Sequence, residues 1–221
     1  GSGSLANDAV GGQIKLLQQP GLILSNGEFG DRLIDHATRL GLQFDVHRKG
    51  WGQPFDYAEL RNRMDRAPKA HWIWAVHCET STGILNDLDA LRTIASETGL
   101  KLCLDCISAI GTVPVDLRGV YLASCVSGKA LAAFPGLSMV FYHHELKPAP
   151  QALPRYLDLG YYAEQEGIPF THSSNLLCAL QTALRRTDWP AKFGQIRQVA
   201  QWLRGRLNEL GFQILAPEEQ A

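Results

Sequence analysis

Short apolar runs alternate along the chain with segments whose apolar residues recur every three or four positions. The runs have the length of buried strands, and the periodic segments have the pattern of helices packed on one face. The apolar runs cover residues 22–24, 42–46, 72–76, 102–104, 120–125 and 138–142. Strands of this kind, joined by crossover helices, predict an α/β domain with a mostly parallel, doubly wound sheet flanked by helices. We expect the ligand site at the carboxyl ends of its strands.

Two amphipathic helices are predicted in the first half of the chain, over residues 31–40 and 86–97. Each places its leucines and isoleucines on one face. Each is also followed by a glycine, Gly41 or Gly99, and glycine is a frequent helix stop. These helices supply the crossover connections that a parallel sheet requires.

A longer amphipathic helix is expected over residues 193–210, where apolar residues recur at three and four positions until Gly211. A strand is predicted directly after it, over residues 212–215. We expect two domains: a large ligand-binding domain over residues 1–188, with its N-terminal part missing, and the start of a truncated C-terminal small domain over residues 189–221.

Composition narrows the function classes. Lysine and arginine number 21 against 22 acidic residues, which leaves no electrostatic footprint for nucleic acid or an anionic membrane surface. No apolar run approaches the roughly 20 residues of a membrane-spanning helix. A cytoplasmic location and small-molecule partners are therefore expected. The five cysteines lie mostly in apolar stretches, which favours buried, reduced thiols over a disulfide framework.

A carboxylate and a lysine follow consecutive predicted strands. Asp105 comes directly after the run 102–104, and Lys129 follows the run 120–125. Each has an ordinary alternative, a turn cap for Asp105 and a solvated surface position for Lys129. Together they suit pyridoxal phosphate (PLP), which needs a lysine for a Schiff base and a carboxylate against its pyridine nitrogen. We expect the apolar residues 130–134 to desolvate Lys129 and make it nucleophilic.

A phosphate-binding loop is predicted at the start of the chain. Gly3 lets backbone N–H groups approach a phosphate, Ser2 and Ser4 add hydroxyls, and the helix expected next adds its positive N-terminal end. The same G-x-G-x-x-A pattern over residues 1–6 fits a dinucleotide fingerprint, so a nicotinamide-dinucleotide-binding oxidoreductase domain remains an alternative. Against it, the run 22–24 is not followed by the acidic residue which that fingerprint expects.

No metal site is predicted. His77 has no second histidine or cysteine at ligand spacing, so a structural hydrogen-bonding role is expected for it. Cys103 and Cys106 formally spell CxxC, but in a strand they point to opposite faces, which argues against both a zinc clip and a redox pair. His143 and His144 are expected at the surface.

Several motifs, taken together, resemble the class V aminotransferases in both order and spacing. They are His-Cys-Glu-Thr-Ser-Thr-Gly at 77–83, Asp-Cys-Ile-Ser-Ala-Ile-Gly at 105–111, Ser-Gly-Lys at 127–129 with Pro-Gly-Leu at 135–137, Asn-Gly-Glu-Phe-Gly at 26–30, and Pro-Phe-Thr-His at 169–172. The resemblance covers nearly the whole chain. It implies the large domain of a fold-type I PLP-dependent transferase.

The resemblance assigns a phosphate-binding role to five residues. Ser2, Gly3 and Ser4 hold the cofactor phosphate, and Ser127 adds a contact to it. Thr171 matches a position that reaches the phosphate of the neighbouring subunit, which implies a homodimer. An ordinary turn residue remains the alternative for Thr171.

Further residues are assigned to the cofactor ring by the same resemblance. Phe29 stacks on the pyridine ring, Thr80 hydrogen-bonds the ring hydroxyl, Asp105 pairs with the pyridine nitrogen, and Lys129 forms the Schiff base and transfers the proton. Gly128 departs from relatives that carry Gln or Asn before the lysine, so that phosphate contact is lost here.

The resemblance implies a transaminase that moves an amino group from a small amino donor to a small 2-oxo acid, pyruvate or glyoxylate. The sequence of residues 77–80 is most similar to the 2-aminoethylphosphonate–pyruvate branch, with the alanine–glyoxylate and serine–glyoxylate enzymes next. The arginine that grips the substrate carboxylate in relatives is expected beyond the last residue. A cysteine desulfurase-like lyase, or a fragment that binds cofactor without turnover, remains an alternative.

Overall fold

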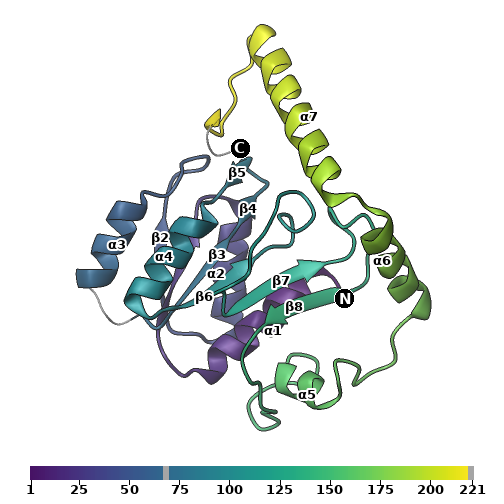
Figure 1. The fold of residues 1–221 in the computed structure, drawn as a ribbon. Coiled ribbons are helices and arrows are strands. Elements are labelled where there is room, and N and C mark those ends of the chain that lie inside the picture. The colour runs from purple at the N-terminus through teal and green to yellow at the C-terminus, as the bar shows by residue number, and fades with distance from the viewer. Residues whose placement is uncertain (67–69, 219–221) are drawn as a thin grey trace.

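The computed structural model describes residues 1–66 and 70–218, and a six-stranded sheet in the order β2-β1-β3-β6-β7-β8 lies at its centre (Figure 1). The strands are β1 (Gly21–Ser25), β2 (Phe44–Arg48), β3 (Trp72–Val76), β6 (Lys101–Asp105), β7 (Leu122–Val126) and β8 (Ser138–Tyr142). All neighbours pair in parallel except β8, which runs antiparallel to β7. The predicted mostly parallel α/β sheet is confirmed.

The helices are α1 (Gly3–Leu16), α2 (Glu28–Leu40), α3 (Tyr57–Arg66), α4 (Leu88–Thr98), α5 (Leu159–Glu164), α6 (Ser174–Arg186) and α7 (Trp189–Glu209). A short hairpin, β4 (Cys78–Glu79) with β5 (Ile84–Leu85), follows β3. Gly41 and Gly99 end α2 and α4 with φ angles of 69° and 71°, the left-handed conformation that glycine adopts without a steric penalty. The predicted helix stops are confirmed.

The sheet carries helices on both faces, and the alternation of side chains along β3 explains why. Trp72 and Trp74 point into the layer formed with α1 and α2, whereas Ile73 and Ala75 point into the layer formed with α3 and α4. Full burial of a large apolar side chain stabilises the fold by roughly 1.5–3 kcal/mol. Two apolar layers therefore fix the sheet, and its strand ends stay free to build a site.

The cysteines are reduced, as expected: all five carry free thiols. Cys103 packs in the layer of α1 and α2, and Cys106 packs in the opposite layer, so the CxxC spelling does not bring the two thiols together. Cys178 differs from the expectation of burial, because it lies exposed on α6.

The end of the chain agrees with its prediction only in part: the long helix expected over residues 193–210 is present as α7, which begins earlier, at Trp189. Helices α6 and α7 have no buried residue, and α7 extends away from the sheet (Figure 1). The strand predicted over 212–215 is wrong: this segment is irregular, and the guanidinium of Arg204 donates a hydrogen bond to the carbonyl oxygen of Ala216 (2.7 Å) directly after it. A domain boundary near residue 188 stays a prediction. None of the helices in the described ranges is long and apolar enough to cross a membrane.

Candidate active site

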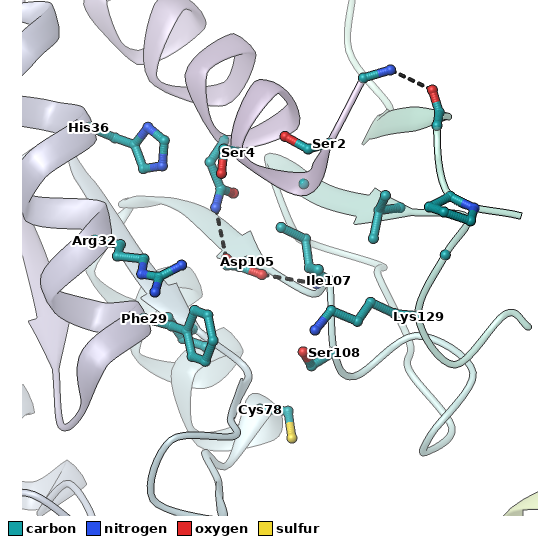
Figure 2. Close-up of a pocket in the computed structure, with 18 residues that line it drawn as sticks. Ser2, Ser4, Phe29, Arg32, His36, Cys78, Asp105, Ile107, Ser108 and Lys129 are labelled. Carbon is teal, nitrogen blue, oxygen red and sulfur yellow. Dashed lines mark hydrogen bonds between the residues drawn. The ribbon is translucent and has the colours of Figure 1, made fainter.

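A cavity of about 520 Å³ lies at the carboxyl ends of β3, β6 and β7, next to the first turns of α1 and α2. This is the edge of a parallel sheet at which ligands are expected. Six of the predicted site residues line it: Ser2, Gly3, Ser4, Phe29, Asp105 and Lys129. Figure 2 shows Asp105 and Lys129 directed into the same space, with Phe29 on the other side of it. Side chains more than a hundred positions apart in the sequence thus meet in one site.

Asp105 forms the floor of the cavity and is only 5% exposed. Its Oδ2 accepts a hydrogen bond from Nδ2 of Asn7 at 2.8 Å, and its Oδ1 accepts one from the backbone N–H of Ile107 at 2.9 Å. Burial raises the pKa of Asp105, while the two hydrogen bonds oppose that shift because they favour the charged form. The floor is therefore a desolvated carboxylate whose two oxygens each have a fixed donor.

One end of the cavity is the N-terminus of α1. Ser2 is the N-cap residue, and its carbonyl oxygen accepts a hydrogen bond from the Ser138 hydroxyl at 2.6 Å. A Cβ atom at Gly3 would lie 2.7 Å from Cδ1 of Ile107, so a side chain there would clash. The first N–H groups of a helix have no partner within the helix and carry its positive end. This end of the cavity suits an anion such as a phosphate.

The wall opposite Lys129 comes from α2. Phe29 is half-buried and presents its ring, and the guanidinium carbon of Arg32 lies 4.9 Å from the centre of that ring. One turn further, Nδ1 of His36 lies 2.6 Å from a carboxylate oxygen of Asp8 on α1. The wall therefore combines the aromatic surface of Phe29 with the Arg32 guanidinium and the His36 imidazole.

Lys129 stands at the mouth of the cavity. The chain turns directly after β7, and Lys129 is exposed together with Gly128, while Phe134 is 68% exposed. The expectation that neighbouring apolar residues desolvate Lys129 is therefore wrong for this chain, since Lys129 itself is exposed. Of those neighbours, Ala132 and Phe134 are exposed too, whereas Leu131 is buried. The loop itself is tight: a Cβ atom at Gly128 would lie 2.6 Å from Cβ of Pro135 and 2.7 Å from its Cα. Backbone packing fixes the position of Lys129 even though its side chain is open to solvent.

The chain was compared with known proteins in sequence and in fold. No family model matches the chain. A 2-aminoethylphosphonate–pyruvate transaminase from Paraburkholderia xenovorans is 30% identical over 97% of this chain. The crystal structure of an alanine–glyoxylate aminotransferase from Nostoc superimposes over 100% of the chain with a TM-score of 0.85 and 29% identity. The chain is therefore similar over nearly its whole length to aminotransferases, in agreement with the predicted resemblance to the class V family.

The match covers only part of each relative. The chain spans 58% of the length of the Paraburkholderia protein and 62% of the Nostoc protein. A relative named soluble hydrogenase 42 kDa subunit, from Anabaena cylindrica, is 34% identical over 74% of this chain and 45% of its own length. The fold-type I assignment is confirmed by the structural match.

Three residues that the class V resemblance assigns to the cofactor lie outside the cavity lining. Thr80 and Thr171 are exposed on their loops. Ser127 is buried, and its hydroxyl is occupied within the loop: it donates to the carbonyl oxygen of Phe134 at 2.7 Å and accepts from the N–H of Leu137 at 3.2 Å. The cofactor roles of these three residues stay predictions.

The histidines differ in part from their predictions. His77 is buried as a structural residue would be, but its Nδ1 has no hydrogen-bond partner among the described residues. Burial lowers the pKa of His77 to about 4. His143 is exposed as expected, whereas His144 is half-buried and stacks on Tyr121 with the ring centres 4.0 Å apart. Within the ranges described, no group of three or more His, Cys, Asp or Glu side chains could hold a metal ion.

Four residues that line the cavity were not predicted from the sequence. Asn7 and Cys78 line the cavity, and so do Arg32 and His36. A helical signal was available for two of them, because Arg32 and His36 follow Phe29 at three and seven positions and so share its face. Burial raises the pKa of Cys78 to about 11, so this thiol stays neutral beside the floor.

Proposed function

We propose that this chain is the cofactor-binding part of a PLP-dependent aminotransferase. Its amino donor is a small amine of the 2-aminoethylphosphonate, alanine or serine type, and its acceptor is pyruvate or glyoxylate. The observation that carries the proposal is the pairing of buried Asp105 with Lys129 in one cavity, whose far end is the N-terminus of α1. The names of the relatives support the same reaction class.

The lining residues fit PLP group by group. A buried carboxylate with one lone pair of each oxygen already engaged suits a cationic pyridine nitrogen, and Asp105 supplies it. Phe29 supplies an aromatic face for stacking on the ring. The free N–H groups at the start of α1, with the hydroxyls of Ser2 and Ser4, suit the phosphate. These residues would hold the group.

Bound PLP supplies an aldehyde that combines with amines and a ring that takes up electrons from the substrate carbon. Lys129 is the residue that would hold that aldehyde. When free, its Nζ would accept the proton lost by the substrate carbon, which requires a neutral amine. Asp105 would face the ring nitrogen as its carboxylate partner at the floor.

Assembly and location remain part of the proposal. A homodimer, with Thr171 reaching the phosphate of the neighbouring subunit, follows from the class V resemblance. The exposed position of Thr171 leaves it accessible to a second subunit. Additional roles for Thr80 at the ring hydroxyl and Ser127 at the phosphate complete the proposed site, and we propose a cytoplasmic enzyme.

A half-reaction screen tests the proposal. The PLP-loaded protein is mixed with 2-aminoethylphosphonate, alanine or serine, and the visible absorbance of the aldehyde form is followed. We expect one donor to remove that band and pyruvate or glyoxylate to restore it, with no response in Lys129→Ala. Binding of nicotinamide dinucleotide, with no PLP retained, would instead support the oxidoreductase alternative.

A further inference from the structure

A buried polar triad lies beneath the cavity floor. Asp105 on β6 and Ser124 on β7 are register partners, so their side chains lie next to each other on the same face of the sheet. Asn7 on α1 lies over both: its Nδ2 is 2.8 Å from Oδ2 of Asp105, and its Oδ1 is 2.7 Å from the Ser124 hydroxyl. All three residues are buried. The helix thus bridges two neighbouring strands through one amide.

The amide of Asn7 has only one orientation that satisfies both neighbours. An ionised carboxylate only accepts hydrogen bonds, so the NH₂ side of the amide must face Asp105. The amide oxygen then faces Ser124, whose hydroxyl donates to it; the other acceptor near that hydroxyl, the carbonyl oxygen of Leu104, is farther away at 3.4 Å. A flipped amide would place two acceptors against each other in a buried site, which is costly.

We propose that Asn7, oriented by Ser124, is a positioning residue that holds the Asp105 carboxylate in one plane and favours its ionised form toward the cofactor ring nitrogen. This inference rests on the proposed function for the identity of the ring. We call the Asn7 amide, with its hydrogen bonds to Asp105 and Ser124, the clamp. It is a property of the protein alone, because its hydrogen bonds are formed entirely by α1, β6 and β7.

Other charged side chains also affect the pKa of Asp105. Glu79 raises the pKa of Asp105 by like-charge repulsion, and His36 lowers it. Lys129 lines the same cavity. The nearby thiols, Cys106 among them, have pKa values raised by burial and stay neutral. Burial has the largest effect and raises the pKa of Asp105. The hydrogen bonds from Asn7 and Ile107 are the direct contacts that lower it and so favour the ionised form.

The test substitutes the triad and follows the Asp105 carboxyl directly. Asn7→Leu removes both hydrogen bonds at similar volume, and Ser124→Ala removes only the group that orients the amide. Gln13→Leu is the matched control, since Gln13 is a buried amide on the same helix whose contact goes to Leu157 instead (3.4 Å). The first readout is the ¹³C carboxyl titration of Asp105 in the cofactor-free protein.

We expect the titration midpoint of Asp105 to rise by about one pH unit in Asn7→Leu and by a smaller amount in Ser124→Ala. Gln13→Leu should leave it unchanged. In the PLP-loaded protein, the ¹⁵N shift of the pyridine nitrogen should move toward the unprotonated value in the same order, and PLP affinity should fall about tenfold in Asn7→Leu. A merely structural Asn7 would alter thermal stability without moving either NMR signal.

The outcomes separate the two proposals. An unchanged Asp105 midpoint in both Asn7→Leu and Ser124→Ala overturns the clamp, whatever the protein does with PLP. If Asn7→Leu does not fold, the midpoint in Ser124→Ala decides alone, and no shift there overturns the clamp. Failure of the unsubstituted protein to bind PLP overturns the proposed function, whereas a shifted midpoint in the cofactor-free variants still supports the clamp.

Discussion

The floor and the mouth of the cavity are built in opposite ways. At the floor, Asp105, Asn7 and Ser124 are buried and joined by hydrogen bonds of 2.7 and 2.8 Å. At the mouth, Lys129 and Phe134 are exposed on a loop. The floor belongs to the sheet and α1, whereas the mouth begins after β7 has ended.

This difference separates two tasks. A buried carboxylate with a hydrogen bond to each oxygen resists reorientation, because moving it would leave polar groups without partners. An exposed lysine can change its rotamer at little cost, as a group that must leave one partner and move a proton requires. The floor therefore holds the Asp105 carboxylate in place, and the mouth leaves the Lys129 side chain free to move. Substitutions at the mouth and at the floor should therefore change different properties of the protein.

Lys129→Ala should remove covalent cofactor attachment and lower transaminase turnover by more than about a thousandfold. Because Lys129 is exposed, the thermal midpoint should change by no more than about 2 °C. Half-reaction kinetics and calorimetry measure the two effects. Lys192→Ala is the control substitution, because the amine of Lys192 contacts the carbonyl oxygen of Ala130 in the same loop. Turnover close to the unsubstituted rate in Lys129→Ala would contradict the assigned role.

Asp105→Asn keeps the shape of the floor and removes its charge. We expect turnover to fall about a hundredfold, because a neutral amide cannot stabilise a protonated pyridine nitrogen. The ¹⁵N shift of the bound cofactor should report an unprotonated nitrogen. Asp116→Asn, at a partly exposed aspartate that is paired with Arg118 outside the cavity lining, should leave turnover unchanged. If turnover did not depend on the charge of Asp105, the Asp105→Asn and Asp116→Asn variants would have equal rates.

His77 should make the fold sensitive to acid. Burial lowers its pKa from 6.5 to about 4, so between these values the unfolded chain binds more protons than the folded one. Stability is therefore present above pH 6.5 and falls by about 1–3 kcal/mol as the pH drops to 4. Denaturant unfolding of His77→Gln should show a smaller loss across that window. His143→Gln, at an exposed histidine, should retain the full loss.

Phe134→Ser should have the smallest effect. The side chain is 68% exposed, so the free energy of unfolding should change by less than about 0.5 kcal/mol. Denaturant titration measures it, with buried Phe55→Ser as the contrasting substitution. A large loss of stability in Phe134→Ser would show that the mouth is packed, contrary to the comparison.

Local pattern in the sequence predicted the sheet well and the loops poorly. The β3 run is apolar on both faces, and burial on both faces is a local signal. The strand predicted over 212–215 failed because its apolar residues specify no partner edge, and strand formation needs one. The apolar residues after Lys129 did not reveal that Lys129 itself is exposed. Composition alone does not set the direction of a loop.

The site residues divide along the same line. Asp105 and Lys129 were predictable because parallel strands bring their carboxyl ends to one edge. The segment Ser2–Ser4 was predictable as part of the site from its glycine and the helix expected after it, but the predicted loop is wrong, because α1 already begins at Gly3. Asn7 was not, because its role depends on a helix lying across the register pair Asp105 and Ser124, and no local spacing encodes that arrangement.

The most direct test of the central claim is to locate the bond between protein and cofactor. The PLP-loaded protein is reduced with borohydride, digested and mapped by mass spectrometry. The account predicts loss of the visible band and a reduced pyridoxyl-phosphate label on Lys129, absent from Lys129→Ala. A label on another lysine, such as Lys192, or no label with PLP retained, would contradict it.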